Sequence, residues 1–557
     1  MDNASAFNTS GTAASSTLLT LGNTGQTDCM EIRSDFYNEV GGSASQYCTI
    51  LQGSSTLTLT AGQYYQRGIF VIGNLANDVC AFDVQNGIWN HWSGVIVIAS
   101  GTNSKGLLRI ANGANMSVVG TGGGTAASSI TICGSNSGAG NEGMIGDFVA
   151  DGVSTSYNFS TVDIGKAKNV PGGMGTFTHL EGTGTVAKVY VGDTSPGAFV
   201  MKSGTIRYVA GTPQLQIGVN ATGTFTMDGG VIGQAGVVVP PLTLGQATGG
   251  NGTFTMNGGA LTVGKIILGN VAGSYGTLNI TGGTITSTSV GDHYVGLAGS
   301  GTVIQTGGAV SFPTGSNLRT YIGGQGGSGY YDLGGTGFLN AQAKPLRVGG
   351  TANACGTLVL RQSGSLTAGQ LMVGGWDAPS GAASGAVGSM SIIGSGVTIN
   401  LSNNSTAVGS KDGAFYLAPL AKLTLRADDG GLSKIIALAG GGSGVYWVAF
   451  FDTGSVVDIG FADGVTPPAY DPDPLLNKRY YTLIDCTGLA NTRSNVYFDQ
   501  SSTTAMLTAD SIAAGWVVVP DSNNQKLVFS FTPVPEPATL ALLAIGGATM
   551  LLRRRRG

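Results

Sequence analysis

The residues that could carry out chemistry are few and scattered along the 557-residue chain. Cleavage of a polysaccharide needs clustered carboxylates, a cation site, or a lysine or arginine base on neighbouring segments. Asp428 and Asp429 are an adjacent acid pair, but their Ala-Asp-Asp-Gly-Gly context is typical of a turn. Asp471 and Asp473 stand among prolines, which favours a solvated loop over a calcium site. We therefore predict no catalytic residue, no metal site and no cofactor.

Histidines and aromatic residues offer one candidate binding patch. His179 and His293 are far from each other and from His91 in the sequence, so we expect no shared metal site. His91 lies between two aromatic residues in the segment Trp89-Asn-His-Trp92. Aromatic faces can bind sugar rings, and an exposed cluster of this kind could contact a glycan. The alternative is a loop that anchors the N-terminal part of the fold.

The six cysteines show no Cys-x-x-Cys spacing, which argues against a zinc site. Cys29 and Cys48 are the pair closest in sequence, and a disulfide between them could form in an exported protein. We expect Cys133 and Cys355 to be small buried hydrophobic residues.

The composition excludes several classes of protein. Glycine contributes 95 of 557 residues, about 17% against an average near 7%, and charged residues only 10%. Glycine does not recur at every third position and proline is scarce, so the chain is not collagen-like. Its hydrophobic content of 42% argues against disorder. With 26 Lys and Arg and a net charge of −4, it lacks the basic surface that nucleic acid requires.

A degenerate repeat runs through the middle of the chain. Each unit opens with glycine, a small residue, an apolar residue, any residue and an apolar residue, as in Gly252-Thr-Phe-Thr-Met. Ten openings between Gly175 and Gly413 have a mean spacing of about 26 residues. An apolar residue followed by glycine closes most units, as in Leu244-Gly245. The alternation of apolar and polar residues within the opening is the pattern of a half-buried strand.

Short strands of this kind bury their apolar faces only if successive units stack. In the clearest unit we expect strands at 253–256, 260–263 and 265–268, with glycine at the corners to supply positive φ angles. The sequence therefore predicts an all-β fold, a parallel β-helix or β-solenoid. Gln305 and a 32-residue interval after Gly356 should loosen its register locally. The residues predicted to stack in one inward column are Phe225, Phe254, Leu278, Val303, Tyr331, Leu358, Met390 and Phe415.

Two alternatives to this fold remain, a β-sandwich and a tandem array of small β-domains, both of which need antiparallel returns of the chain. The repeats resemble the Gly-rich strand repeats of autotransporter passengers over about residues 160–440. That resemblance also implies a β-solenoid.

The C-terminus carries the most specific pattern, a Pro-Glu-Pro box, 15 uncharged apolar residues at 538–552 and four arginines. As a helix, the apolar segment would be about 22 Å long, shorter than the ~30 Å core of a bilayer. The arginines favour the cytoplasmic side, so the preceding chain should face outward. The alternative is a buried core helix with a solvated basic end. The predicted signal residues are Val534, Pro535, Glu536, Pro537, Arg553, Arg554, Arg555 and Arg556.

This tail resembles the PEP-CTERM sorting signal of Gram-negative-type bacteria. The resemblance implies an exported protein whose short transmembrane helix is held transiently in the inner membrane, where an exosortase recognises and removes the tail. Residues 1–30 lack a basic n-region and an apolar core, although an N-terminal secretion signal should accompany such a tail. We expect a start site placed too far downstream or a signal already removed.

Five regions follow from these patterns: a flexible leader (1–27), irregular β-helical coils (28–170), regular repeats (171–440), a β-rich cap (441–532) and the sorting signal (533–557). We predict a non-enzymatic structural or adhesive protein of the cell surface or extracellular matrix, whose partners are the exosortase, polysaccharide or other surface proteins. The alternatives are a polysaccharide lyase or hydrolase on the same scaffold and an adhesin with a specific glycan ligand.

Overall fold

The computed structural model describes most of the chain between the leader and the sorting signal. The described residues are 19–21, 29–32, 36–38 and 47–533, the last range with gaps at 54, 93, 119–127, 134–143, 167–172, 210, 234–238, 289–290, 313–318, 352, 375–384, 402–413, 438–448, 470–477, 486–495, 499–505 and 520–525.

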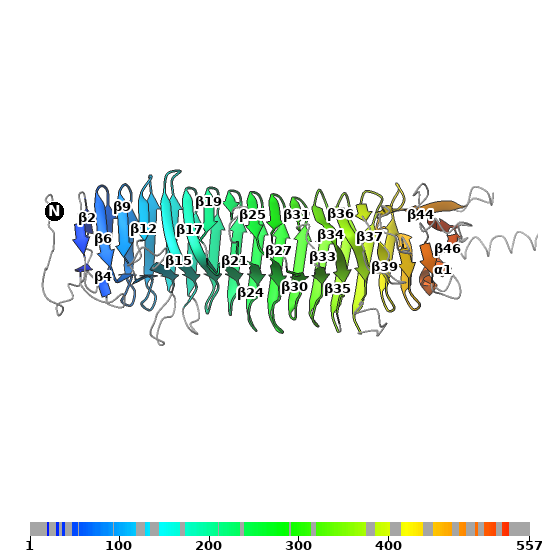
Figure 1. The fold of residues 1–557 in the computed structure, drawn as a ribbon, viewed down its shortest axis with the longest axis horizontal. Coiled ribbons are helices and arrows are strands. Elements are labelled where there is room, and N and C mark those ends of the chain that lie inside the picture. The colour runs from blue at the N-terminus through cyan, green and yellow to red at the C-terminus, as the bar shows by residue number, and fades with distance from the viewer. Residues whose placement is uncertain are drawn as a thin grey trace, which may run out of the picture.

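The described chain is an elongated solenoid of stacked coils (Figure 1). One coil consists of β24 (Asn251–Met256), β25 (Ala260–Val263) and β26 (Ile266–Leu268), and each strand pairs in parallel with its equivalents in the coils before and after. The first strand of each coil contributes to a 16-stranded sheet, which we call sheet B, and the others to a 31-stranded sheet, sheet A. A parallel β-solenoid is therefore the observed fold, as the sequence predicts.

Sheet B holds one strand from every coil. Its strands are β2 (Cys29–Ile32), β5 (Thr56–Leu59), β8 (Val79–Val84), β11 (Lys105–Ala111), β14 (Ile145–Asp151), β16 (Met174–His179), β18 (Gly197–Met201), β21 (Thr222–Met227), β24, β27 (Tyr275–Ile280), β30 (Ser300–Gln305), β33 (Ser328–Leu333), β35 (Cys355–Arg361), β37 (Val387–Ile393), β40 (Lys422–Ala427) and β43 (Val456–Phe461).

Sheet A forms the other sides of the coils. Its strands are β1 (Leu19–Leu21), β3 (Phe36–Asn38), β4 (Tyr47–Leu51), β6 (Gln63–Arg67), β7 (Ile69–Ile72), β9 (Ile88–Trp92), β10 (Gly94–Ile98), β12 (Asn115–Val118), β13 (Ser128–Ile132), β15 (Ser156–Ile164), β17 (Thr183–Val191), β19 (Thr205–Tyr208), β20 (Gln214–Ile217), β22 (Val231–Ile232), β23 (Leu242–Leu244), β25, β26, β28 (Thr284–Ser287), β29 (His293–Val295), β31 (Ala309–Ser311), β32 (Thr320–Ile322), β34 (Phe338–Val348), β36 (Ser365–Val373), β38 (Thr398–Leu401), β39 (Phe415–Leu417), β41 (Ile435–Ala437), β42 (Ala449–Phe451), β44 (Arg479–Asp485), β45 (Val496–Phe498), β46 (Trp516–Val519) and β47 (Lys526–Phe531).

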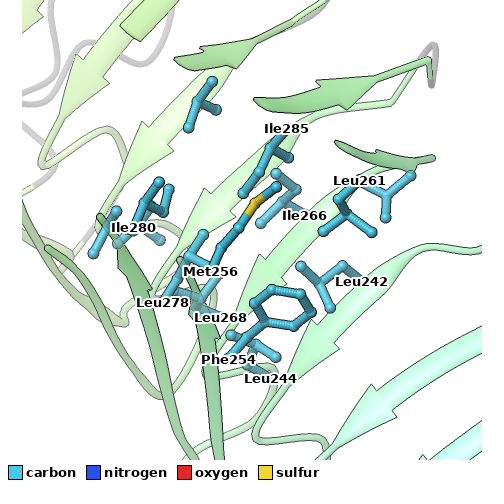
Figure 2. Packing of buried hydrophobic residues seen from close by; sticks show 14 of the residues in the cluster. Leu242, Leu244, Phe254, Met256, Leu261, Ile266, Leu268, Leu278, Ile280 and Ile285 are labelled. Atoms are coloured by element: carbon cyan, nitrogen blue, oxygen red, sulfur yellow. The ribbon is translucent and has the colours of Figure 1, made fainter. Parts of the chain in front are cut away.

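The core is a continuous column of apolar side chains inside the coils. In β21, β24 and β27 every second residue is buried, so the polar residues between them face outward. Phe225 stacks on Phe199 and on Phe254, with ring centroids 4.3 and 4.8 Å apart. Figure 2 shows the packing around Phe254, where side chains from all three sides of the coil meet. The predicted inward column is confirmed from Phe225 to Met390.

The two glycines of each unit serve different purposes. Gly245, which closes a unit, has a φ of 71°, a conformation that disfavours any side chain. Gly252, which opens the next unit, faces inward, and a Cβ there would lie 2.0 Å from the carbonyl oxygen of Ile217. The closing glycine is thus needed for backbone conformation, as predicted, and the opening glycine for the close approach of a neighbouring coil.

The last member of the predicted column is wrong. Phe415 belongs to β39 in sheet A, where it pairs with Leu371 and Ala449. In sheet B the column continues from Met390 to Leu423. The segment before Leu423 begins with alanine instead of the usual glycine, which conceals the true opening of this unit.

The two departures expected to loosen the register do not do so. The ladder passes from Gly356 to Gly388 without a shift, although the interval between them is long. Gln305 keeps its place between Ile280 and Leu333, fully buried. Its side chain amide donates to backbone oxygens and its carbonyl accepts from the hydroxyl of Tyr331 at 2.6 Å. A polar side chain can therefore occupy the column where its hydrogen bonds are satisfied.

The N-terminal coils follow the same plan. Within the region predicted as irregular β-helical coils, β5, β7, β10, β11 and β13 each pair in parallel with the equivalent strands of neighbouring coils. β1 lies within the segment predicted as a flexible leader and pairs in register with β4, so the ladder begins earlier than expected there.

At the C-terminal end the pairing changes from parallel to antiparallel. β47 pairs antiparallel with β44 and β46, and helix α1 (Ala509–Ala513) lies against β43, the last strand of sheet B (Figure 1). Trp516 is fully buried in this region and contacts Phe531 at a centroid distance of 5.0 Å. The C-terminal end is thus β-rich, and it combines antiparallel strands with one short helix in place of the parallel coils.

Candidate functional site

The predicted glycan patch is wrong for two of its three residues. Trp89 and His91 lie on strand β9, not on a loop, and both side chains are fully buried. The Trp89 ring packs against Phe82 and Phe70 with centroid distances of 4.8 and 5.3 Å. A ring enclosed in the core cannot stack on a sugar. The side chain of Trp92 lies outside the described residues.

Two further sets of predicted residues cannot be placed. The side chains of Cys29 and Cys48 lie outside the described part of the chain, and so does the sorting signal from Val534 to Arg556. Among the described residues, no helix is long and apolar enough to cross a membrane. Cys133 is buried, as predicted, but Cys355 is exposed at an outward position of β35.

The acid residues considered for chemistry are dispersed. Asp428 forms a turn, as predicted, because its carboxylate accepts the N–H groups of Gly430 and Ser395, each at 2.9 Å. Asp471 and Asp473 lie outside the described residues. Within the described ranges, no group of three or more His, Cys, Asp or Glu could hold a metal ion.

One carboxylate has unusual surroundings that sequence reasoning missed. Asp163 on β15 is 3% exposed, and its Oδ2 lies 2.6 Å from the Nζ of Lys166. Burial raises the pKa of Asp163 to about 6, and the charge of Asp193 adds to this effect against the lowering by Lys166. Tyr190 occupies the same register position in the next coil. A carboxyl group that titrates near neutral pH could donate a proton to a substrate.

The three histidines are buried and separate. Burial lowers the pKa of His91, His179 and His293 to about 4 in each case. They are therefore neutral at physiological pH. His91 contacts a backbone oxygen at 3.0 Å and His179 the hydroxyl of Tyr157 at 3.2 Å, which are structural contacts.

A stack of aromatic residues runs along the outward side of sheet A. Tyr294 and Tyr321 occupy the same position in neighbouring coils, with ring centroids 5.1 Å apart and nearly parallel planes. Arg347 follows in the next coil, with its Cζ 5.7 Å from the Tyr321 centroid. A Cβ at Gly350 would lie 2.3 Å from the Tyr321 ring, so glycine is needed for the ring to lie flat. Since Tyr321 is only 4% exposed, this stack stabilises the coils.

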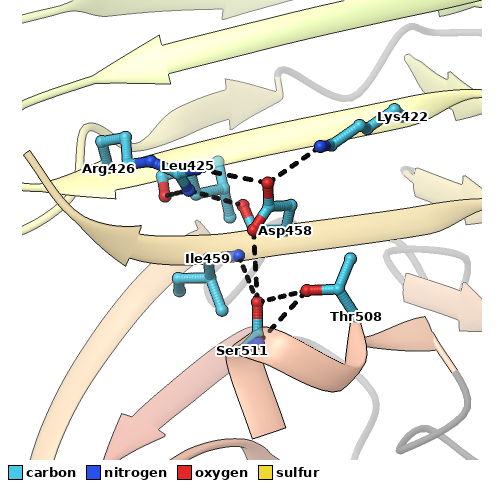
Figure 3. A network of polar contacts seen from close by, with 7 residues as sticks. All are labelled: Lys422, Leu425, Arg426, Asp458, Ile459, Thr508 and Ser511. Atoms are coloured by element: carbon cyan, nitrogen blue, oxygen red, sulfur yellow. Dashed lines mark hydrogen bonds and ion pairs between the residues drawn. The ribbon is translucent and has the colours of Figure 1, made fainter. Parts of the chain in front are cut away.

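A polar network fixes the C-terminal end of sheet B (Figure 3). Asp458 on β43 forms ion pairs with Lys422 at 2.9 Å and Arg426 at 3.2 Å. Burial favours a higher pKa for Asp458, but the hydrogen bonds and charges of Lys422 and Arg426 outweigh it and lower the pKa. The carboxylate is therefore ionised at neutral pH.

Helix α1 is attached to the same strand. The hydroxyl of Ser511 accepts the N–H of Ile459 at 2.9 Å and donates to Asp458 at 3.4 Å. The N–H of Thr508 donates to the carbonyl of Val457 at 3.0 Å, and its hydroxyl caps the helix by accepting from Ser511. These contacts satisfy backbone groups that would otherwise be exposed at the end of the sheet.

Sequence reasoning missed Asp163 because its raised pKa comes mainly from burial, and it missed Asp458 because its partners come from other segments of the chain. The sequence holds one usable signal, the position of Asp458 in a strand next to one that carries Lys422 and Arg426. It becomes visible only when the register between those strands is known.

Comparison with known proteins adds one finding. Residues 533–556 match the PEP-CTERM protein-sorting motif. No curated protein and no solved structure matches the chain. The resemblance of the repeats to autotransporter passengers therefore stays a prediction.

Fold and motif together define an exported β-solenoid protein. Its C-terminal motif is of the kind that exosortase, a membrane processing enzyme, recognises, and it implies export to the cell envelope or surface.

Proposed function

We propose that the protein is a structural and adhesive rod of the bacterial cell surface or extracellular matrix. The observation that supports this best is the unbroken parallel ladder of sheet B from β2 to β43. Its fifteen inter-strand steps at ~4.8 Å give a rod about 70 Å long. In such a ladder each coil contacts only its neighbours, and the shared core distributes an applied load along the axis.

The second support is the surface chemistry. Only 10% of the residues are charged, and the outward positions of the regular coils are rich in threonine, serine and asparagine. Hydroxyl and amide groups can both donate and accept hydrogen bonds, so such faces suit adhesion to polysaccharide or to neighbouring rods.

Processing at the C-terminus would release the rod. In this proposal the apolar segment at 538–552 holds the protein transiently in the inner membrane of a Gram-negative-type cell, and exosortase cuts near the Pro-Glu-Pro box. Mass spectrometry of the mature protein from fractionated cells tests this. We expect a C-terminus that lacks Arg553–Arg556, whereas a surface form that retains these arginines would contradict processing.

The structural role is tested in cells that lack the gene. We expect a matrix with lower stiffness in rheology, restored by the wild-type chain. A chain in which Arg553–Arg556 are replaced by serine serves as a control for sorting, because its solenoid is intact but its signal is not. Unchanged stiffness in the deletion strain would contradict a structural role.

A second candidate function is cleavage of a polysaccharide, favoured by the buried carboxyl group of Asp163. Its Oδ1 has no hydrogen-bond partner among the described residues, and a pKa of about 6 suits a general acid. Release of sugars by the purified protein that Asp163→Asn abolishes would support an enzyme. Asp228→Asn is the control, because Asp228 is a partly exposed carboxylate paired with Lys202.

A further inference from the structure

The outward face of sheet B changes character along the solenoid. From β21 to β30, four consecutive strands present twelve outward positions, of which seven are threonine and none is charged. We call this stretch the neutral face, and nine of its twelve outward side chains carry a hydroxyl group.

Threonines on the neutral face form a straight row along the axis. Thr224, Thr253, Thr277 and Thr302 occupy one register position in four neighbouring strands. Adjacent strands lie ~4.8 Å apart, so the row repeats a hydroxyl group at that spacing. Each hydroxyl has one donor and two acceptor sites. A partner whose own hydroxyl groups recur along a chain can therefore form a series of similar contacts.

Two exposed tyrosines stand on and beside this face. Tyr275 on β27 is 54% exposed, and Tyr330 on β33 is 37% exposed. Both are outward positions of sheet B, two strand steps apart, or about 10 Å along the axis. A tyrosine combines an apolar ring with a polar tip, which suits a partner with both apolar and hydroxylated faces. The separation allows each ring to contact a different unit of one extended ligand.

The charges that border the neutral face neutralise each other. At the turn after β21, Asp228 pairs with Lys202 at 2.5 Å and accepts the amide of Asn257 at 2.7 Å. On β33, Asp332 accepts two hydrogen bonds from the guanidinium of Arg361, at 2.7 and 2.8 Å. Neither pair leaves a free charge to attract an anionic or cationic partner. The electrostatic match is to an uncharged ligand.

We propose that the neutral face binds an uncharged polysaccharide chain along the solenoid axis, with Tyr275 and Tyr330 in contact with sugar rings and the threonine row in contact with hydroxyl groups. This inference rests on the proposed adhesive function and adds the ligand class and the surface. It also replaces the predicted patch around Trp89, which is buried.

Affinity gel electrophoresis of the purified full chain tests the proposal. The neutral probes are hydroxyethylcellulose, galactomannan and dextran, and the anionic probe is alginate. We expect at least one neutral polymer to retard the protein and alginate to leave its mobility unchanged. The double variant Tyr275→Ala/Tyr330→Ala should bind about tenfold more weakly, since it removes both ring contacts with the sugar.

Two controls distinguish binding from folding. Tyr480→Ala removes a tyrosine that is 61% exposed on β44, far from the neutral face, and should bind as the wild type does. Thr277→Glu places a charge in the middle of the row and should weaken binding to the neutral polymer. All variants should keep the wild-type thermal unfolding midpoint, because the replaced side chains face outward.

The proposal is overturned if no neutral polymer retards the protein, if alginate binds preferentially, or if the double tyrosine variant keeps wild-type affinity. Self-association of the purified protein that the tyrosine variant abolishes would assign the face to a second copy of the chain instead. If no neutral polymer retards the protein but the wild-type chain restores matrix stiffness in the deletion strain, the structural role stands and only this inference fails.

Discussion

The middle coils and the C-terminal end of the solenoid treat the edge of a strand in different ways. In the middle, β24 pairs with β21 on one side and β27 on the other, and all three share the same alternation of outward polar and buried apolar residues after the opening Gly-Thr. At the end, β43 has β40 on one side only, and its other edge meets the short segment around α1. The middle thus depends on repetition, and the end on a few specific polar contacts.

This difference determines how each region should respond to mutation. A repeated position is constrained by the backbone of the neighbouring coils, which cannot move without disturbing the ladder. The end is constrained by one carboxylate, Asp458, with partners on two elements. We therefore expect steric changes to be most damaging in the middle and electrostatic changes to be most damaging at the end.

The largest effect should come from Gly252→Ala in the middle coils. The new Cβ would lie 2.0 Å from the carbonyl oxygen of Ile217, a backbone atom that is held in the ladder. We expect a loss of more than about 4 kcal/mol of unfolding free energy. Urea denaturation followed by far-ultraviolet circular dichroism measures the change.

Gly249→Ala is the matched control for that variant. Gly249 has a φ of 83°, but no heavy atom lies within 4 Å of the position of its Cβ. Only the conformational cost should apply, about 1 kcal/mol. Equal losses in the two variants would show that the close approach of the coils is not the main constraint on the opening glycine.

Acid should destabilise the solenoid next most strongly. The pKa of His91 is about 4 in the folded state and 6.5 when exposed, so the folded state binds fewer protons. Its contribution is complete above pH 6.5 and falls between pH 6.5 and 4, by at most about 3 kcal/mol. His179 and His293 behave alike. Asp163 acts in the opposite sense, because its raised pKa favours folding below pH 3.8 and opposes it as pH rises through about 6.

Urea denaturation at pH 7, 6 and 5 measures this dependence. Since three groups oppose one, the unfolding free energy should decrease as the pH falls over this range. His91→Gln removes one titrating group and should make the decrease shallower, whatever its effect at pH 7. An equally steep decrease in the variant would mean that His91 is not the source.

The repeats explain why so much of the fold was predictable from the sequence. The register of a unit such as Gly252-Thr-Phe-Thr-Met can be predicted from its own sequence, because alternation identifies the inward residues and the glycine marks the start. Where that mark is lost the prediction fails, as it did at Phe415. Ala421 stands where the other units have their opening glycine, and the segment beginning at Gly413 has the opening pattern although Phe415 belongs to the other sheet.

The candidate sites were predictable only where they are local. The sorting motif is contiguous, and the family comparison confirms it. The segment from Trp89 to Trp92 shows aromatic residues without showing which side of a strand they occupy. Burial of Trp89 depends on Phe70 and Phe82, which come from other strands. To predict an ion pair between coils, such as that of Asp458 with Lys422, the register of the two strands must be known. In irregular regions the sequence does not indicate that register.

Asp458→Ala should have an intermediate effect, confined to the C-terminal end. Its side chain is 18% exposed and has two cationic partners and Ser511. We expect a local loss of about 2 kcal/mol, because removal leaves the partners partly buried without their counter-ion. Hydrogen exchange measured by mass spectrometry should show faster exchange in β43 and α1 than in β24.

Asp228→Ala is the control from the middle coils. This carboxylate also pairs with a lysine, Lys202, but the pair lies on an exposed turn. Such pairs contribute at most about 1 kcal/mol. Similar exchange in the two variants would contradict a special role for the polar network at the end.

The smallest effect concerns Gln305, a polar residue at a buried, inward position of sheet B. Gln305→Leu gives this position the apolar character of its neighbours Ile280 and Leu333 but removes the acceptor for the Tyr331 hydroxyl. We expect a loss of about 1–2 kcal/mol in urea denaturation, because the buried hydroxyl then lacks a partner. Tyr331→Phe added to Gln305→Leu should recover part of that loss. No recovery would locate the cost at the backbone oxygens of Gly308 and Phe338, to which the amide donates. Either result measures how well the repeated coils tolerate a specific polar contact. Contacts of that kind otherwise stabilise the C-terminal end of the solenoid.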